Sequence, residues 1–153
     1  MFTNFPTVNF LDENQLFLRK LENSPHEFTL TGSRFFGQPN SQSDYDFFIE
    51  SSAAVRDWLR NNSFSHVDKD RYFRDCFEIE AVYQRAKVKV QLVTSASKKI
   101  RIQDIIVNTY PGFCHMEKTQ RKLFWQIAYL CYNEAAGLQP VATPVFPNSM
   151  YVA

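Results

Sequence analysis

A glycine, a serine and two aspartates in one short stretch have the types and spacing that phosphate and metal chemistry requires. Gly32 and Ser33 end a segment rich in strand-forming residues, and Asp44 and Asp46 follow after ten intervening residues. Where a strand gives way to a turn or a helix, free backbone N–H groups can bind an anion, and glycine lets a phosphate approach closely. Because side chains alternate along a strand, positions 44 and 46 are expected to direct both carboxylates to the same face.

Two carboxylates on one face repel each other unless a cation lies between them, so the pair is expected to have a raised apparent pKa. Mg²⁺ prefers one or two carboxylates together with substrate phosphates, which predicts that Asp44 and Asp46 bind Mg²⁺ and a triphosphate. Phosphate donors and metal ligands on adjacent strand ends are typical of in-line nucleotidyl transfer, for which this pair would be catalytic. Arg34 follows the serine directly and is a candidate phosphate ligand, although a surface position is an equally simple interpretation.

The sequence Gly32-Ser33, ten residues and then Asp44-x-Asp46 resembles the signature of the DNA-polymerase-β-like nucleotidyltransferase superfamily, and in particular its minimal, single-domain members. Some of those proteins are antitoxins that transfer AMP from ATP to a tyrosine of a partner toxin. The resemblance implies the nucleotidyltransferase fold, a short mixed sheet flanked by helices with a C-terminal helix. It also implies Mg²⁺ as cofactor, ATP as the default nucleoside triphosphate, and a hydroxyl acceptor on a protein or RNA.

One part of the family pattern is missing. The family usually carries a third carboxylate on a later central strand, where it positions or deprotonates the attacking hydroxyl, but residues 88–93 offer Lys89 and Gln91 on one face and no acid. We name Glu80, on the preceding predicted strand, as the candidate third catalytic residue, with Glu78 as its alternative. Otherwise two carboxylates suffice, or the chain is a non-catalytic module that binds a nucleotide or masks a partner protein.

Hydrophobic periodicity predicts the elements that position these residues. The predicted helices span residues 12–22, 52–61, 98–108 and 117–136. The predicted strands span residues 28–31, 45–50, 64–67, 75–84 and 87–93. The last helix is expected to bury an apolar stripe of Leu123, Phe124, Ile127, Leu130 and Cys131. Strands in the first two thirds with helices at both ends indicate an α+β domain over residues 1–138, followed by a Pro-rich C-terminal arm over residues 139–153.

The composition excludes several classes of protein. With 153 residues, 44% apolar and 22% charged, the chain is typical of one globular domain and not of a disordered or coiled-coil protein. Three cysteines without a Cys-x-x-Cys pair specify neither a disulfide framework nor a structural metal site. The absence of a signal peptide and of a membrane-length apolar run predicts a cytoplasmic protein with no membrane partner.

A run of basic residues is the last feature with functional meaning. Six lysines and arginines between positions 85 and 101 are interrupted by no acid. This run could hold a triphosphate or an RNA backbone, or it could form an ordinary solvated surface. The sequence therefore leaves three hypotheses: a Mg²⁺-dependent nucleotidyltransferase, a non-catalytic nucleotide-binding or partner-masking module, and an RNA-binding accessory protein.

Overall fold

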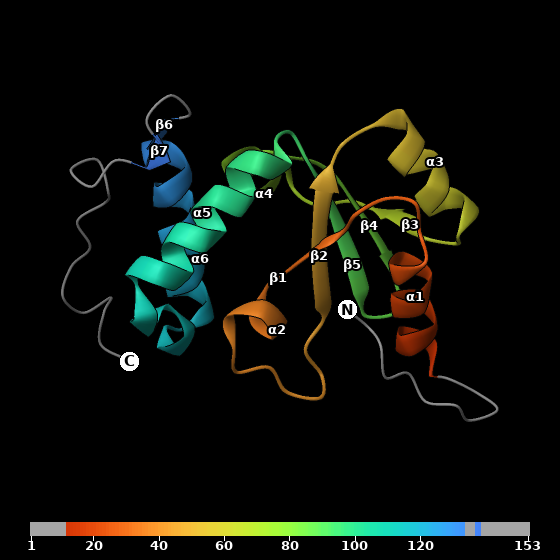
Figure 1. Cartoon of the computed structure of the whole chain (residues 1–153), viewed down its shortest axis with the longest axis horizontal. Helices are drawn as coiled ribbons and strands as arrows, with labels where there is room; N and C mark the ends of the chain where they lie inside the picture. Colours follow the sequence, from red (N-terminus) through yellow and green to blue (C-terminus); the bar gives the residue numbers. More distant parts are fainter. Residues whose placement is uncertain (1–11, 134–136, 139–153) are drawn as a thin grey trace.

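A five-stranded mixed sheet forms the centre of the protein (Figure 1), as seen in a computed structural model that describes residues 12–133 and 137–138. Its strands are β1 (Thr29–Thr31), β2 (Tyr45–Glu50), β3 (Ser65–Val67), β4 (Ile79–Arg85) and β5 (Val88–Val93). They lie in the order β1-β2-β5-β4-β3. The pair β2 and β5 is parallel, and the other neighbours are antiparallel. The predicted α+β class is confirmed, while the predicted arm at 139–153 lies outside the described residues.

Helices cover both faces of this sheet. The α-helices are α1 (Glu13–Glu22), α2 (Ser33–Phe36), α3 (Ala53–Asn61), α4 (Arg71–Cys76), α5 (Ala96–Thr109) and α6 (Lys118–Cys131). A 3-10 helix, η1 (Pro111–His115), joins α5 to α6, and a short ribbon of β6 (Tyr132–Asn133) and β7 (Gly137–Leu138) follows. Among the described residues, no helix has the length and apolar character that crossing a membrane requires.

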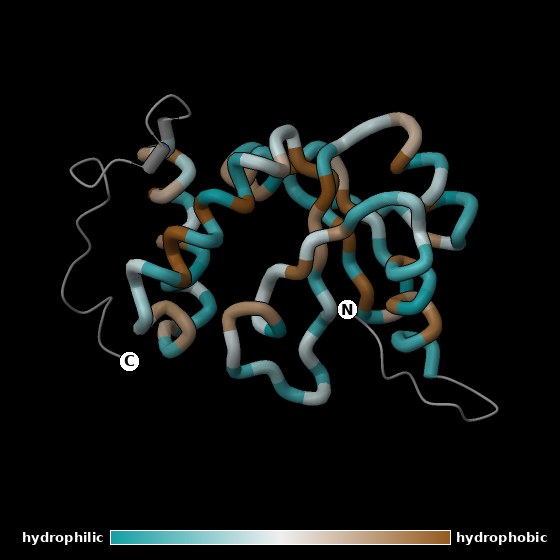
Figure 2. Tube along the Cα trace, in the orientation of Figure 1, coloured by the Kyte–Doolittle hydropathy of each residue, from teal (hydrophilic) through white to brown (hydrophobic). Residues whose placement is uncertain are grey.

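Alternation along β2 and β5 divides the core into two parts. Phe47 and Val90 pack with residues of α1 and α3, whereas Phe48 and Val93 pack with residues of α5, η1 and α6. Figure 1 shows α1 and α3 on one side of the sheet and α5 and α6 on the other, and Figure 2 shows apolar residues on the strands between them. Since Asp46 lies two residues before Phe48, its side chain is on the α5–α6 side.

Polar residues at the helix starts explain where several helices begin. Asp12, Ser52 and Ser95 each accept a hydrogen bond from the backbone N–H three residues later, at 2.8, 3.1 and 3.2 Å. Glu117 and Gln120 form a capping box at the start of α6. Such caps satisfy backbone donors that have no partner within the helix, and each contributes about 1 kcal/mol.

The predicted strand 75–84 is wrong at its start. Asp70 caps α4 by accepting a hydrogen bond from Phe73 N at 2.8 Å, so the chain is helical through Cys76. Glu78 then has a φ of 53°, which turns the chain, and β4 begins only at Ile79. An irregularity in pairing between Ile79 and Ala81 also interrupts the expected alternation.

The predicted apolar stripe of the last helix is wrong in part. Phe124 is buried as expected, but Leu123 and Leu130 are 42% and 85% exposed. Ala128 and Tyr129 are buried in place of the two leucines. The helix is therefore rotated about its axis relative to the prediction. As a result, a polar flank of α6 faces the end of the sheet where β2 begins and the aspartates lie.

Candidate functional site

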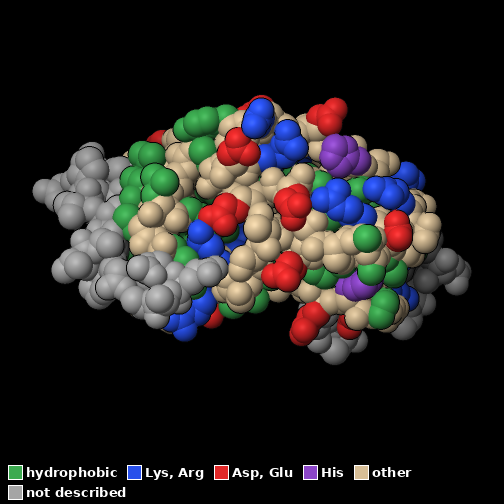
Figure 3. Space-filling model, turned by 90° about the horizontal axis from the view of Figure 1, so that it is seen from above, with side chains coloured by type: hydrophobic (Ala, Val, Ile, Leu, Met, Phe, Trp, Pro, Cys, Tyr) green, Lys and Arg blue, Asp and Glu red, His purple; other side chains and the backbone are tan. Residues whose placement is uncertain are grey.

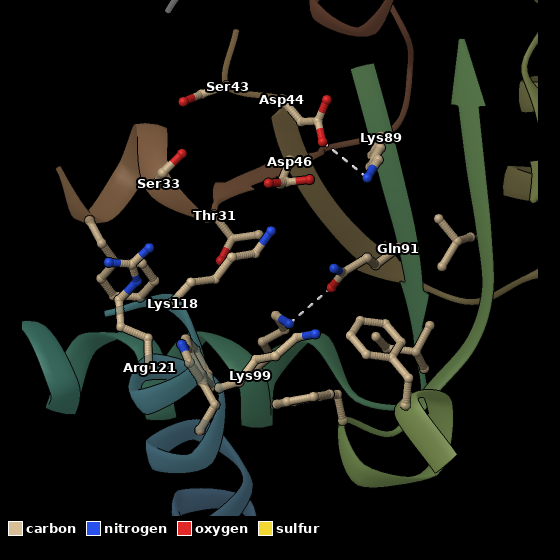
Figure 4. A pocket seen from close by; sticks show the side chains of 18 of the residues that line it. Thr31, Ser33, Ser43, Asp44, Asp46, Lys89, Gln91, Lys99, Lys118 and Arg121 are labelled. Carbon is tan, nitrogen blue, oxygen red and sulfur yellow. Dashed lines mark hydrogen bonds and ion pairs between the residues drawn. The ribbon is translucent and has the colours of Figure 1, made fainter. Parts of the chain in front are cut away.

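A pocket of about 560 Å³ lies between the ends of β1 and β2 and the helices α5 and α6 (Figure 4). Four residues predicted from sequence line it together: Gly32, Ser33, Asp44 and Asp46. They meet because β1 and β2 are antiparallel neighbours, with Thr31 opposite Asp46 in the pairing. The end of the first strand is therefore beside the start of the second. Figure 4 shows the side chains of Ser33 and Asp46 directed into the pocket.

Two features require glycine at position 32: its backbone conformation and the closeness of the Asp46 side chain. Its φ of 72° and ψ of −163° lie in a region that is essentially restricted to glycine. A β-carbon on residue 32 would lie 2.5 Å from Asp46 Oδ2, which is closer than real β-carbons approach. The missing side chain thus provides the space that the Asp46 carboxylate occupies.

The strand expected to hold a third carboxylate instead supplies an ammonium group. Lys89 pairs with Asp46 in the parallel register of β2 and β5, and Lys89 Nζ lies 3.0 Å from Asp44 Oδ2. Lys89 and Gln91 lie on the predicted shared face and both line the pocket. The two charged side chains are 24% and 35% exposed, so solvent screens their attraction and the ion pair is weak.

Asp46 has a raised pKa. Burial is the largest cause because it disfavours the charged carboxylate, and repulsion from Asp44 adds to it. Lys89, Lys99 and Lys118 act in the opposite direction. The repulsion expected from sequence therefore contributes at Asp46, although burial has the larger effect.

Lys99 of α5 is the most unusual side chain of the pocket. It is 5% exposed, and its Nζ donates a hydrogen bond to Gln91 Oε1 at 3.0 Å. Burial lowers the pKa of Lys99 to about 8, against the opposing effect of Asp46. Its nitrogen also lies 5.2 Å from the ring centroids of both Phe48 and Trp125. An ammonium in this position is expensive to bury, and the aromatic faces offset only part of that cost.

A buried hydrogen bond fixes α5, and with it Lys99, relative to the strand that ends at Gly32. Thr31 Oγ1 donates to Gln103 Oε1 at 2.7 Å, and Gln103 Nε2 donates to Leu30 O at 3.2 Å. Lys99 is one turn before Gln103 on the same helix, so it faces the same side. The end of β1, which Gly32 and Ser33 follow, and the part of α5 that carries Lys99 are thus held in a fixed relative position.

Further basic residues complete the pocket, and sequence reasoning missed those of α6. We call the following set the basic wall: Lys69, Lys99, Lys118, Arg121 and Lys122. Three of them lie on one side of α6 with Trp125, at spacings of three and four residues. That spacing was the available signal, but basic residues at the start of an amphipathic helix are ordinarily solvated. Only the packing of α6 against the sheet directs them to the aspartates.

Two predicted site residues lie elsewhere. Arg34 does not line the pocket: its Nη2 donates to Ser43 O at 3.0 Å and its guanidinium lies 3.8 Å from the centroid of the Tyr45 ring, so it holds the loop before Asp44. Glu80 does not line it either: its Oε1 lies 3.9 Å from Nη2 of Arg56, a residue of α3, which covers the other face of the sheet. Glu78 pairs with Lys98. The third carboxylate expected at Glu80 or Glu78 is therefore not beside the aspartates.

The basic run between positions 85 and 101 does not form one surface. Lys89 and Lys99 line the pocket, whereas Arg85 pairs with Glu13 at 3.1 Å and Lys98 pairs with Glu78. Figure 3 shows acidic and basic side chains interspersed on the face seen from above. This distribution offers an extended RNA backbone no continuous basic track on that face.

The carboxylates present fit one Mg²⁺ ion and not two. Among the described residues, no group of three or more His, Cys, Asp or Glu side chains could hold a metal. Asp44 and Asp46, with phosphate oxygens from a bound substrate, supply the one or two carboxylates that Mg²⁺ ordinarily takes. A second ion bridged by a further carboxylate has no ligand in the described part of the chain.

Replacing Gly32 by alanine should destabilise the protein. The backbone conformation alone costs about 1–3 kcal/mol for a residue with a side chain, and the new methyl group also displaces the Asp46 carboxylate. Gly112→Ala is the matched control, because a β-carbon at Gly112 meets nothing within 4 Å. Urea denaturation should give a lower midpoint for Gly32→Ala only. Equal midpoints for the two variants would show that Gly32 is not constrained.

Lys99→Met should raise the free energy of unfolding at pH 7, on the order of 3 kcal/mol at most, because it removes a buried charge. The pKa of Lys99 is about 8 in the folded state and near its ordinary 10.5 in the unfolded state. Between these values the unfolded state binds more protons, so wild-type stability from this group rises with pH. The difference between wild type and Lys99→Met should therefore narrow from pH 8 to pH 10.

Thermal unfolding at several pH values measures this difference. The control is Arg101→Met, at an exposed position of the same helix, whose difference from wild type should stay constant over the same range. A Lys99→Met protein that is less stable than wild type at pH 7 would contradict the interpretation.

Comparison with known proteins adds no family assignment. No protein-family model, no curated protein and no solved structure matches this chain. A function for this chain must therefore be inferred from its sequence and from the geometry of the pocket.

Proposed function

We propose that this chain binds a nucleoside triphosphate in the pocket and transfers its nucleoside monophosphate to a hydroxyl group of a protein or RNA, with Mg²⁺ held by Asp44 and Asp46. The new bond joins the hydroxyl oxygen to the α-phosphorus, pyrophosphate leaves, and the hydroxyl proton is released to water. The observation that carries the proposal is that Gly32, Ser33 and the two aspartates line one pocket opposite the basic wall. ATP is the first nucleotide to test because the Gly-Ser and Asp-x-Asp spacing resembles that of minimal nucleotidyltransferases.

Each part of the pocket has a role in this proposal. The Ser33 hydroxyl donates to a phosphate oxygen, and the basic wall neutralises the charge of the triphosphate. Mg²⁺, when bound, neutralises charge on the transferring phosphate and polarises the attacking oxygen. Phe73 and Trp125 offer aromatic faces for a base, and the volume of the pocket falls within the usual range of small-molecule sites, about 300–1,000 Å³.

A second candidate function is nucleotide binding without transfer, and the Lys89–Asp44 ion pair favours it. A protonated lysine neither ligates Mg²⁺ nor accepts a proton from the attacking hydroxyl. Lys89 also shares Asp44, one of the two available metal ligands, at 3.0 Å. In this case the pocket holds a nucleotide, or the domain masks a partner protein, with no chemical step.

Transfer is tested with ATP radiolabelled at the α-phosphate, Mg²⁺ and a lysate of the source cells that contains the acceptor. Wild type should label a protein or RNA, and Asp46→Asn should reduce labelling by about 100-fold or more, since it removes charge from the reacting centre. Asp57→Asn, an exposed change of the same kind on α3, is the matched control and should label as wild type does.

Calorimetry on the same proteins separates the two candidates. Binding of ATP by wild type without any labelling would support the non-catalytic function. Absence of binding for ATP, GTP, CTP and UTP in the presence of Mg²⁺ would contradict both transfer and nucleotide binding, and would leave only the masking of a partner protein.

A further inference from the structure

The charges of the pocket are better matched to a free phosphate chain than to a metal complex. Six basic residues and two acidic residues line the pocket, so basic groups exceed acidic ones by four. The triphosphate chain of a nucleotide carries about four negative charges near neutral pH, and its Mg²⁺ complex carries two fewer. Asp44 already has a cation, because Lys89 Nζ is 3.0 Å from its Oδ2.

Lys99 is the strongest single indication of an anion from outside the chain. Among the described residues its ammonium has one hydrogen-bond acceptor, Gln91 Oε1, and forms no ion pair within 4 Å. An ammonium group has three N–H donors, so two have no acceptor from the described chain. A buried charge with unsatisfied donors is costly unless a ligand completes it.

Two basic side chains of α6, Lys118 and Arg121, line the same pocket as Lys99 and are the candidates to complete an anion site. Figure 4 shows Lys118 extending from α6 toward Thr31 and Asp46, with Arg121 on the same helix. Arg121 Nη1 donates to Met116 O at 2.6 Å, which fixes the guanidinium while its other N–H groups are left for a ligand. Guanidinium and ammonium groups on one side of a pocket are suited to a run of phosphates.

We infer that Lys99, Lys118 and Arg121 bind a polyphosphate chain without a divalent cation, and that Lys89 supplies at Asp44 the positive charge that a metal ion would otherwise supply. The nature of the ligand as a nucleotide rests on the proposed function, but the phosphate-chain site does not. Under this inference Mg²⁺ is needed for transfer and not for binding. The basic groups that hold the phosphate chain are on α5 and α6, and the carboxylates that would hold Mg²⁺ are at and just before the start of β2.

The probe is inorganic triphosphate, measured by isothermal titration calorimetry in EDTA and again with Mg²⁺. Wild type should bind in EDTA at least as tightly as with Mg²⁺, and binding should raise the melting temperature. Lys99→Met should weaken binding in EDTA at least tenfold, since a hydrogen bond to a charged group is lost. Arg101→Met, on the exposed side of the same helix, should change affinity less than twofold.

A second variant tests the role of Lys89. Lys89→Met leaves Asp44 without its counter-charge, so binding of triphosphate should become at least tenfold tighter with Mg²⁺ than in EDTA. An unchanged ratio of the two affinities would overturn the role given to Lys89. Melting temperatures of both variants near or above that of wild type show that losses of binding do not reflect unfolding.

The outcomes separate this inference from the proposed function. Wild type that binds triphosphate only with Mg²⁺, or Lys99→Met that binds as wild type does, would overturn the inference even if ATP transfer is observed. Triphosphate binding in EDTA that depends on Lys99, with no transfer from ATP, would support the inference and contradict the transfer.

Discussion

The close approach of the Asp46 carboxylate to the backbone of Gly32 is the constraint on which the site depends. A β-carbon at position 32 would lie 2.5 Å from Asp46 Oδ2, so β1 and β2 can take this pairing only with glycine at the end of β1. The same residue, through its positive φ, turns the chain into α2 and brings Ser33 to the pocket. The loop that returns to Asp44 is then held by Arg34, whose guanidinium donates to Ser43 O. One contact between a backbone and a carboxylate therefore fixes the positions of three of the four motif residues.

The Asp46 carboxylate at this contact and the Lys99 ammonium are buried groups of opposite charge that affect each other across the pocket. Burial raises the pKa of Asp46 and lowers the pKa of Lys99, and each group reduces the cost that burial imposes on the other. The two do not form an ion pair within 4 Å, so this compensation acts at longer range and is incomplete. Such a site is less stable than an apolar one of the same shape, which is the usual relation between stability and a binding site prepared for a charged ligand. The buried Thr31–Gln103 hydrogen bond helps to hold α5 against β1 in spite of this cost.

The part of the site that sequence predicts is the part that is local in sequence. Gly32, Ser33, Asp44 and Asp46 belong to two consecutive strand ends, and the predicted bounds of β2 agree with the structure at both ends. Glu78 and Glu80, the candidates for a third carboxylate, do not line the pocket: Glu78 lies at a turn with positive φ and pairs with Lys98, and Glu80 lies near Arg56 of α3 on the other face of the sheet. Lys118 and Arg121 come from a helix that begins more than seventy residues after Asp46 in the sequence. No periodicity states which flank of an amphipathic helix faces a particular strand end, since that is decided by the packing of whole elements.

Because Lys89 lies beside Asp44, part of the positive charge at this carboxylate comes from the chain itself and does not require a metal ion. A metal ion is taken from solution, and its charge depends on concentration, whereas the Lys89 ammonium is part of the chain and stays beside Asp44. The ammonium neutralises a carboxylate, but it does not polarise an attacking hydroxyl as a Lewis acid does. Because both partners are partly exposed, their ion pair is weak, so it would not prevent Asp44 from holding Mg²⁺ together with Asp46. If the proposed function and the further inference both hold, binding and transfer would depend on different groups: binding of the phosphate chain on the basic wall, and the chemical step on Mg²⁺ held by Asp44 and Asp46.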